Sequence, residues 1–325
     1  MKRTTLAALM AVAVAGGATS AAAQTTDSLL HVSASSTLRF RVNNDGGMAA
    51  VGTWDGDEAA AGAGGVPVEG AGSRVMWYGG KAAFRVGNVN GFGAAYWDLA
   101  SLGFGSVAFG QNSRASGNYS FAANLATTAS GDESVALGNN GTASADRAFA
   151  FNGTASGVGA VAIGSGAQAT NDDALAMGPS SIAGGLASIT LGPSIANGNF
   201  GVAIGLQNSA SGQFSVAIGK NARTANRQGS IVLGDACASF SSDSVYATAN
   251  NQFVVRGCGG LRMFTNQGLT AGVEVAAGGS GWSAVSDRNR KENFLALEGE
   301  DVLARLRNVP VTTWNYISQD RSVRH

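Results

Sequence analysis

The sequence has few charges, few aromatic residues and almost no histidine, and each shortage excludes a class of function. The 325 residues have a formal net charge of zero, so no field attracts nucleic acid or an anionic membrane. The histidines are His31 and His325 alone, which makes a Ser-His-Asp set implausible, and no GK[ST] phosphate loop is present. We therefore predict no nucleic-acid partner, no metal and no organic cofactor.

Cysteine is also scarce, since Cys237 and Cys258 are the only two. In an oxidising compartment they could form one disulfide that closes a loop of roughly 22 residues, worth about 3 kcal/mol in the chain-entropy model. Two buried free thiols, or bridges between chains of an oligomer, are the alternatives. Their spacing and the lack of a nearby histidine argue against a zinc site.

Long hydrophobic runs are absent, and the one apolar stretch near the start is typical of a signal peptide. In residues 1–23, Lys2 and Arg3 supply the positive end, Leu6 to Gly17 the apolar part, and Ala21 to Ala23 the small-residue cleavage site. A membrane anchor is the weaker alternative, because the run is too short to cross about 30 Å of hydrocarbon. We expect an exported protein, secreted or at a bacterial cell surface, without a membrane span.

The sequence does contain a short phrase repeated ten times. The phrases follow one another at an almost constant step, a regularity that indicates a solenoid. With their starting positions they are SVAFG (106), SFAAN (120), SVALG (134), AFAFN (148), AVAIG (160), ALAMG (174), SITLG (188), GVAIG (201), SVAIG (215) and SIVLG (230). With 48 glycines for the corners, the chain can form a narrow coil lined by small side chains.

A weaker half-repeat follows each phrase, as in Ser113 to Gly117, so each coil should have two short strands and two tight turns. Side chains alternate along a strand, so Val216 and Ile218 share one face and Ser215 and Ala217 the other. We expect the branched face to fill the roll and the Ser/Ala face to pack against another chain. One coil buries too little to be stable alone, which implies stacking and oligomerisation.

The phrases with their S-x-A-x-G half-repeats resemble the head repeats of trimeric autotransporter adhesins of the YadA type. The resemblance implies an all-β architecture for residues 99–235, a left-handed parallel β-roll of about ten 14-residue repeats assembled as a homotrimer. It also implies a fibre-like adhesin with a host-surface or polysaccharide ligand. Asn124 and Asn152 replace the turn glycine, which is tolerable because asparagine also adopts the left-handed conformation.

The regions on either side of the repeats differ in composition. Residues 24–98 are rich in Gly and Ala, with strand-like patches at Thr37 to Val42, Arg74 to Tyr78 and Ala82 to Val86. Residues 236–285 read as a connector or cap, in which Asn251 to Arg256 and Gly259 to Asn266 suggest a hairpin.

Charge marks the start of a new domain at Ser286. Arg, Lys, Asp and Glu are frequent from there to the C-terminus, whereas residues 99–235 contain few charged side chains. A helix over Glu300 to Asn308 and a strand over Val311 to Ile317 are expected there.

Residues 286–293 with the predicted helix, Trp314 and Tyr316 resemble the opening of the endosialidase-type intramolecular chaperone domain. Such domains trimerise, assist folding of the preceding fibre and then cleave themselves off. The resemblance implies Ser286 as nucleophile, Lys291 as base and cleavage after Val285. The segments that complete such a domain do not follow His325, so we expect only its start, a short α+β fragment.

Simpler interpretations stay open for these residues. Ser286 could merely cap a turn, and Lys291 could lie on a solvated face. An alternative function is a fibre whose region 24–98 binds or degrades polysaccharide, since paired carboxylates can cleave glycosides. The acidic residues available for that chemistry are Asp45, Asp55, Asp57, Glu58 and Glu69.

Overall fold

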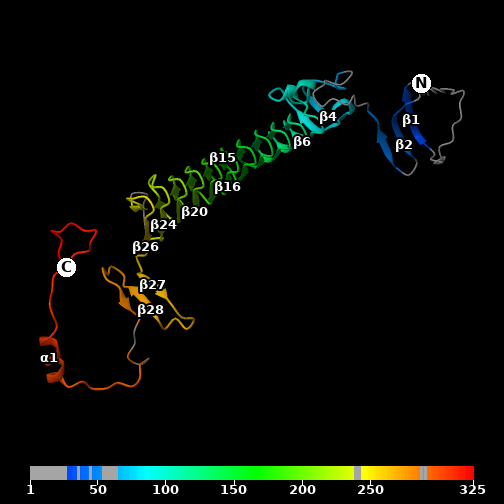
Figure 1. The fold of residues 1–325 in the computed structure, drawn as a ribbon. Coiled ribbons are helices and arrows are strands. Elements are labelled where there is room, and N and C mark those ends of the chain that lie inside the picture. The colour runs from blue at the N-terminus through cyan, green and yellow to red at the C-terminus, as the bar shows by residue number, and fades with distance from the viewer. Residues whose placement is uncertain are drawn as a thin grey trace, which may run out of the picture. The chain divides into compact units, whose positions relative to one another are not determined.

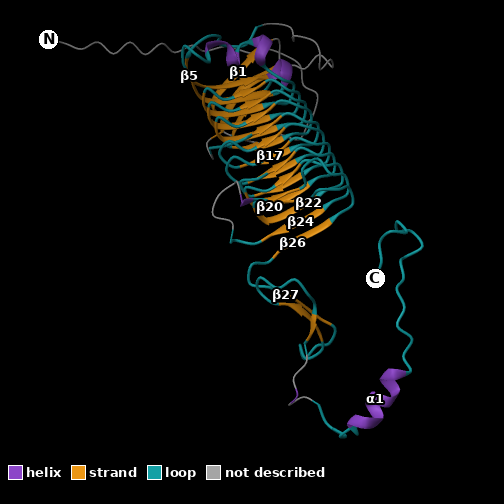
Figure 2. Ribbon diagram, turned by 90° about the vertical axis from the view of Figure 1, so that its left-hand side faces the viewer, coloured by secondary structure: helices purple, strands orange, loops and turns teal. Residues whose placement is uncertain are grey.

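The computed structural model describes residues 28–34, 37–43, 46–52, 65–237, 243–285, 288 and 291–325. The signal sequence predicted for residues 1–23 lies outside these ranges. Contacts divide the chain into two compact units, Met1–Arg256 and Gly257–His325. The first unit contains the solenoid, whose coils stack along one axis (Figures 1 and 2).

The solenoid is the predicted one, a β-solenoid whose coils follow the spacing of the phrases. Each phrase forms one strand of a 13-stranded sheet, and each half-repeat forms one strand of a 10-stranded sheet. The phrase strands are β6 (Val107–Gln111), β8 (Phe121–Leu125), β10 (Val135–Asn139), β12 (Phe149–Phe151), β14 (Val161–Ile163), β16 (Leu175–Met177), β18 (Ile189–Leu191), β20 (Val202–Leu206), β22 (Val216–Lys220) and β24 (Ile231–Gly234). All pair in parallel, with equivalent residues in register, as in Val135↔Phe121 and Ala136↔Ala122.

The second sheet repeats the same register with shorter strands. Its members are β7 (Arg114–Ala115), β9 (Thr128–Ala129), β11 (Thr142–Ala143), β13 (Thr154–Ala155), β15 (Gln168–Ala169), β17 (Ile182–Ala183), β19 (Ile195–Ala196), β21 (Ser209–Ala210), β23 (Ala222–Arg223) and β25 (Val245–Tyr246). Each coil therefore has two strands and two corners, as the half-repeat predicts.

The prediction about which face fills the roll is wrong. Ala217 is fully buried, whereas Val216 is half-buried and Ile218 is 37% exposed. The buried core of the coils is almost entirely alanine. The interior row accepts only small side chains, mostly alanine with Thr190 and Val232, so the larger side chains on either side of it point outward.

The serine that begins most phrases is also buried, and it closes the corner before it. Ser106, Ser120, Ser134 and Ser215 each donate a hydroxyl hydrogen bond of 2.6 Å to the carbonyl of the glycine three residues earlier. The side chain thus satisfies a buried backbone acceptor at a sharp turn. Glycine is needed at the accepting position because a Cβ there would overlap the backbone of the next coil, as at Gly117 against the carbonyl of Gly131.

An antiparallel hairpin closes the N-terminal end of the roll. Its strands, β4 (Gly72–Tyr78) and β5 (Ala83–Val89), lie where strands were predicted, and β5 pairs in parallel with β6. Arg85 is in register with Ala108 and is fully buried. Its guanidinium donates to the carbonyls of Ser106 (2.8 Å) and Ala115 (2.9 Å). Burial lowers the pKa of Arg85 to about 10.

The hairpin has a small apolar core of its own, which includes Met76, Val89 and Leu102. Trp97, in the short 3-10 helix η2 (Ala94–Trp97), is fully buried there and donates from Nε1 to the Ser113 carbonyl at 2.9 Å. A solenoid end exposes unpaired backbone groups, and this core covers the end at β6. Further towards the N-terminus, β1 (Ser28–Ala34), β2 (Thr37–Asn43) and β3 (Met48–Ala50) form a separate antiparallel sheet, with β2 at the predicted strand.

The connector differs from its prediction. Residues 253–256 form β26 (Phe253–Arg256), which pairs in parallel with β24 and extends the large sheet. The expected hairpin of Asn251 to Arg256 with Gly259 to Asn266 does not form, because the first segment continues the solenoid register.

Within the second unit, β27 (Leu261–Phe264) pairs with β28 (Gly272–Val275), which in turn pairs with β29 (Ser283–Ala284). The predicted helix is present as α1 (Gly299–Arg307). The strand expected over 311–317 is absent, since no described strand pairs with it. Among the described residues, no helix has the length and apolar character to cross a membrane.

Candidate functional site

The most extensive candidate surface is the outer face of the 13-stranded sheet. It carries the second and fourth residues of each phrase, and we call this set the outer stripe. Several members are large, apolar and more than a third exposed: Phe109 (37%), Phe151 (41%), Met177 (39%), Ile218 (37%) and Ile231 (40%). Because the phrases are in register, the stripe residues line up in rows along the roll, as in Leu137↔Phe151↔Ile163 and Ile204↔Ile218, with the small Ala123 as one interruption. Apolar rows of this kind are typical of protein interfaces.

Sequence reasoning missed this stripe, although the phrases contain a signal for it. The middle position is Ala in eight of the ten phrases and Thr190 or Val232 in the others, while the flanking positions range from Ala to Phe. A position held to one small size is constrained by packing on all sides. A position that accepts Phe, Leu and Met has room on the outside.

The predicted cleavage site is described only in part. Ser286 lies outside the described residues, Val285 is half-buried, and the Lys291 side chain is exposed. The backbone N–H of Lys291 donates to the Arg288 carbonyl at 3.1 Å. The exposed side chain of Lys291 agrees with the simpler interpretation, in which it lies on a solvated face.

The C-terminal histidine lies in a small aromatic cluster. The His325 ring stacks on Trp314 with 4.8 Å between ring centroids and meets Tyr316 edge-on. The backbone N–H of His325 donates to the Trp314 carbonyl at 2.9 Å, and its Nε2 lies 2.9 Å from the Gln319 Oε1. The residues on which the C-terminal resemblance rests, Trp314 and Tyr316, thus contact one another.

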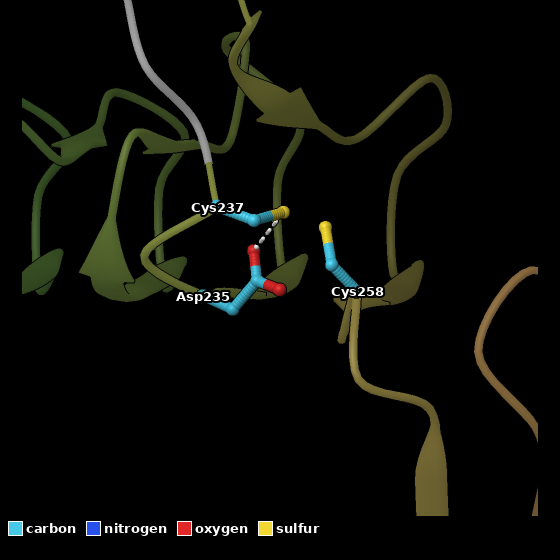
Figure 3. A group of neighbouring side chains, drawn as sticks. All are labelled: Asp235, Cys237 and Cys258. Carbon is cyan, nitrogen blue, oxygen red and sulfur yellow. Dashed lines mark hydrogen bonds between the residues drawn. The ribbon is translucent and has the colours of Figure 1, made fainter.

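The two cysteines are part of a small cluster with Asp235 at the end of the roll (Figure 3). Cys237 Sγ is 3.0 Å from Asp235 Oδ1, and the same carboxylate oxygen accepts from Arg256 Nε at 2.8 Å. Neither cysteine is a free thiol in the described chain. Cysteine and aspartate are common metal ligands, but cysteine binds a metal only as a thiolate. The Asp235 carboxylate is also ion-paired with Arg256, so the cluster fits a metal poorly.

Of the carboxylates considered for glycoside chemistry, Glu69 alone lies within the described residues. Asp45, Asp55, Asp57 and Glu58 lie outside the description. Glu69 is exposed and its Oε1 accepts the backbone N–H of Leu99 at 3.4 Å. The described residues therefore contain no second carboxylate of this set that could act with Glu69 in cleaving a glycoside.

A comparison with protein families matches residues 101–123, 129–151, 155–189 and 196–222 to the YadA head domain repeat (2 copies). A search of the curated proteins found no match. The matched segments all lie in the coils, from the end of the N-terminal closure to β23. The solenoid of this chain therefore carries repeats similar to the YadA head domain repeat.

Proposed function

We propose that this protein is an exported bacterial surface fibre whose head is a homotrimer of the β-solenoid. The observation that carries the proposal is the outer stripe, an apolar surface that runs the length of the roll in one chain. Contact with two further copies would bury it, and the similarity to YadA heads favours three copies over two. Residues 1–23 would direct export, and the assembled head would face the surroundings of the cell as an adhesin.

The energetics favour association through this face. Fully burying a Val, Leu, Ile or Phe side chain contributes about 1.5–3 kcal/mol relative to full exposure. The most exposed stripe members retain 37–41% of their exposure in one chain, so each would contribute roughly 0.5–1 kcal/mol on association. The five residues together would contribute about 2.5–5 kcal/mol per chain to association.

The proposal extends to the C-terminal residues. Residues 286–325 would be the start of an intramolecular chaperone domain that assists trimer folding and is then released. Ser286 would act as nucleophile and Lys291 as base, and hydrolysis of the Val285–Ser286 bond would leave a carboxylate on Val285 and a free amine on Ser286.

We also propose that Cys237 and Cys258 form one disulfide within the chain. One support is that neither cysteine is a free thiol. A second is the Arg256–Asp235 ion pair, because Arg256 is two residues before Cys258 and Asp235 is two residues before Cys237. The bond would fasten residues 237–258 at the last coils of the roll. An exported protein meets the oxidising conditions that such a bond requires.

Polysaccharide binding or degradation by residues 24–98 is the alternative function. The structure adds no described pair of carboxylates in favour of it. Incubation of the purified full chain with bacterial polysaccharides tests degradation, because release of reducing sugar requires an enzyme. Binding to host matrix or cells without such release supports the adhesin.

The self-cleavage part has its own test. The chain would be expressed with and without the substitution Ser286→Ala, and the intact mass of each product measured. A product that ends at Val285 only when Ser286 is present supports cleavage by this residue. Identical uncut products would remove self-cleavage from the proposal and leave the trimeric head unaffected.

A further inference from the structure

The fourth coil, residues 148–159, is two residues shorter than its neighbours, and both are missing from one corner. In the preceding coil Gly138 and Asn139 extend β10 to five residues, whereas β12 ends at Phe151. Both sheets keep their register across the short coil, with Leu137↔Phe151↔Ile163 in one and Thr142↔Thr154↔Gln168 in the other. The deletion therefore changes only the corner and leaves the strands in place.

Asn152 replaces part of the missing backbone. Its Oδ1 accepts the backbone N–H of Asn139 at 2.6 Å, where a complete coil would offer a main-chain carbonyl. Asn152 has φ 55°, in the left-handed region that asparagine tolerates better than most residues. The side chain of Asn152 thus holds the shortened corner against the preceding coil.

The shortened corner leaves a recess between two full corners. The recess has a volume of about 460 Å³ and is lined by Asn139, Asn140, Asn152, Gly153, Thr154, Ser165 and Gly166. These residues come from three successive coils. The volume is within the roughly 300–1,000 Å³ range of small-molecule sites.

The lining has the chemistry of a site for a neutral, hydroxyl-rich ligand. It contains no charged and no aromatic side chain, and consists of amides, hydroxyls and glycine. Asn139, Asn140, Thr154 and Ser165 are exposed, and their side chains have no hydrogen bond within the described chain. Amides and hydroxyls both donate and accept, which matches the hydroxyl groups of a sugar.

We propose that this recess binds a neutral saccharide, and that the two-residue deletion creates the site. The inference rests on the proposed adhesin function, to which it adds a ligand class and a position on the head. A few hydrogen bonds in an open recess give weak binding to one chain. Three copies on one trimer would raise the apparent affinity for a surface carrying many saccharides.

The main test fills the recess by restoring the shortened corner to full length. Inserting Gly-Asn between Phe151 and Asn152 gives the corner the sequence of the preceding one, Gly138-Asn139-Asn140-Gly141. The purified full chain, native and with the insertion, would be applied to an array of neutral hexose and N-acetylhexosamine mono- and disaccharides, beside sialylated and sulfated forms. The native chain is expected to bind at least one neutral saccharide, and the insertion to lower that signal more than tenfold.

A second variant removes one hydroxyl. Thr154→Val is expected to weaken saccharide binding about threefold to tenfold, while Thr128→Val, at the equivalent register position two coils earlier, leaves it unchanged. The melting temperature and native mass of every variant are measured alongside. Native chain that binds no neutral saccharide, or binding that survives the insertion, overturns the proposal. The recess belongs to a single chain, so these results are separate from the trimer test.

Discussion

In each phrase the middle residue is buried inside the coil and its two neighbours face outward. Substitutions at the adjacent residues Ala217 and Ile218 should therefore affect different properties, the stability of one chain and the association of three. Ala217 is fully buried between Ala203 and Val232 of the neighbouring coils, so Ala217→Leu forces three extra carbons into a closed interior. Overpacking of this kind costs about 1–3 kcal/mol. The flat coil has little room to relax, so we expect a loss near the upper end of that range that does not depend on protein concentration.

Ile218→Ala acts on the other face. Ile218 is 37% exposed in one chain, so its remaining surface contributes roughly 0.5–1 kcal/mol per chain when it is covered in the trimer. Summed over three chains this is about 2 kcal/mol, or roughly thirtyfold in the trimer association constant. The substitution should therefore lower the melting temperature most at low protein concentration.

Circular dichroism melts at protein concentrations a hundredfold apart distinguish the two variants. The reasoning would be refuted by a concentration-independent effect of Ile218→Ala, or by an Ala217→Leu protein as stable as the parent. Thr190→Ala is a suitable control, because the interior equivalents of Thr190 on both neighbouring coils are alanines.

Three further predictions concern the two ends of the roll. Cys258→Ser should lower the free energy of unfolding by about 3 kcal/mol in oxidising buffer and have no effect with reductant present, as urea titrations would show. Arg85→Met should cost about 2–4 kcal/mol in the same assay, because the Ser106 and Ala115 carbonyls lose their donor. Burial lowers the pKa of Arg85 to about 10 in the fold and not in the unfolded chain, so this residue's contribution to the stability of the parent should rise as pH increases above about 10, and this contribution is absent in Arg85→Met. Trp97→Ala should cost about 3–5 kcal/mol, measured by loss of amide-exchange protection in β4 and β5.

Periodic features of the fold were predictable from the sequence. The phrase spacing identified both strands of every coil, and alternation identified β2, β4 and β5. Helical spacing of Val302, Leu303 and Leu306 identified α1. These predictions succeeded because they depend on local periodicity and turn chemistry.

The errors concern distances between elements, which periodicity does not specify. Alternation in SVAIG gives two faces and does not say which one is inside, because that depends on the spacing of the two sheets. The segment 251–256 has strand character, but its partner, β24, was set by the solenoid register. The recess depends on which corner lacks the two residues within the short step from Ala148 to Ala160. The sequence does not specify this corner, and the position of Asn152 in the structure does.

Native mass spectrometry of the purified chain, at concentrations from nanomolar to micromolar, tests the central claim most directly. We predict a particle of three chains, which Ile218→Ala shifts towards single chains and Thr190→Ala does not. A stable single chain at every concentration would contradict the account, because the outer stripe would then face water along the whole roll.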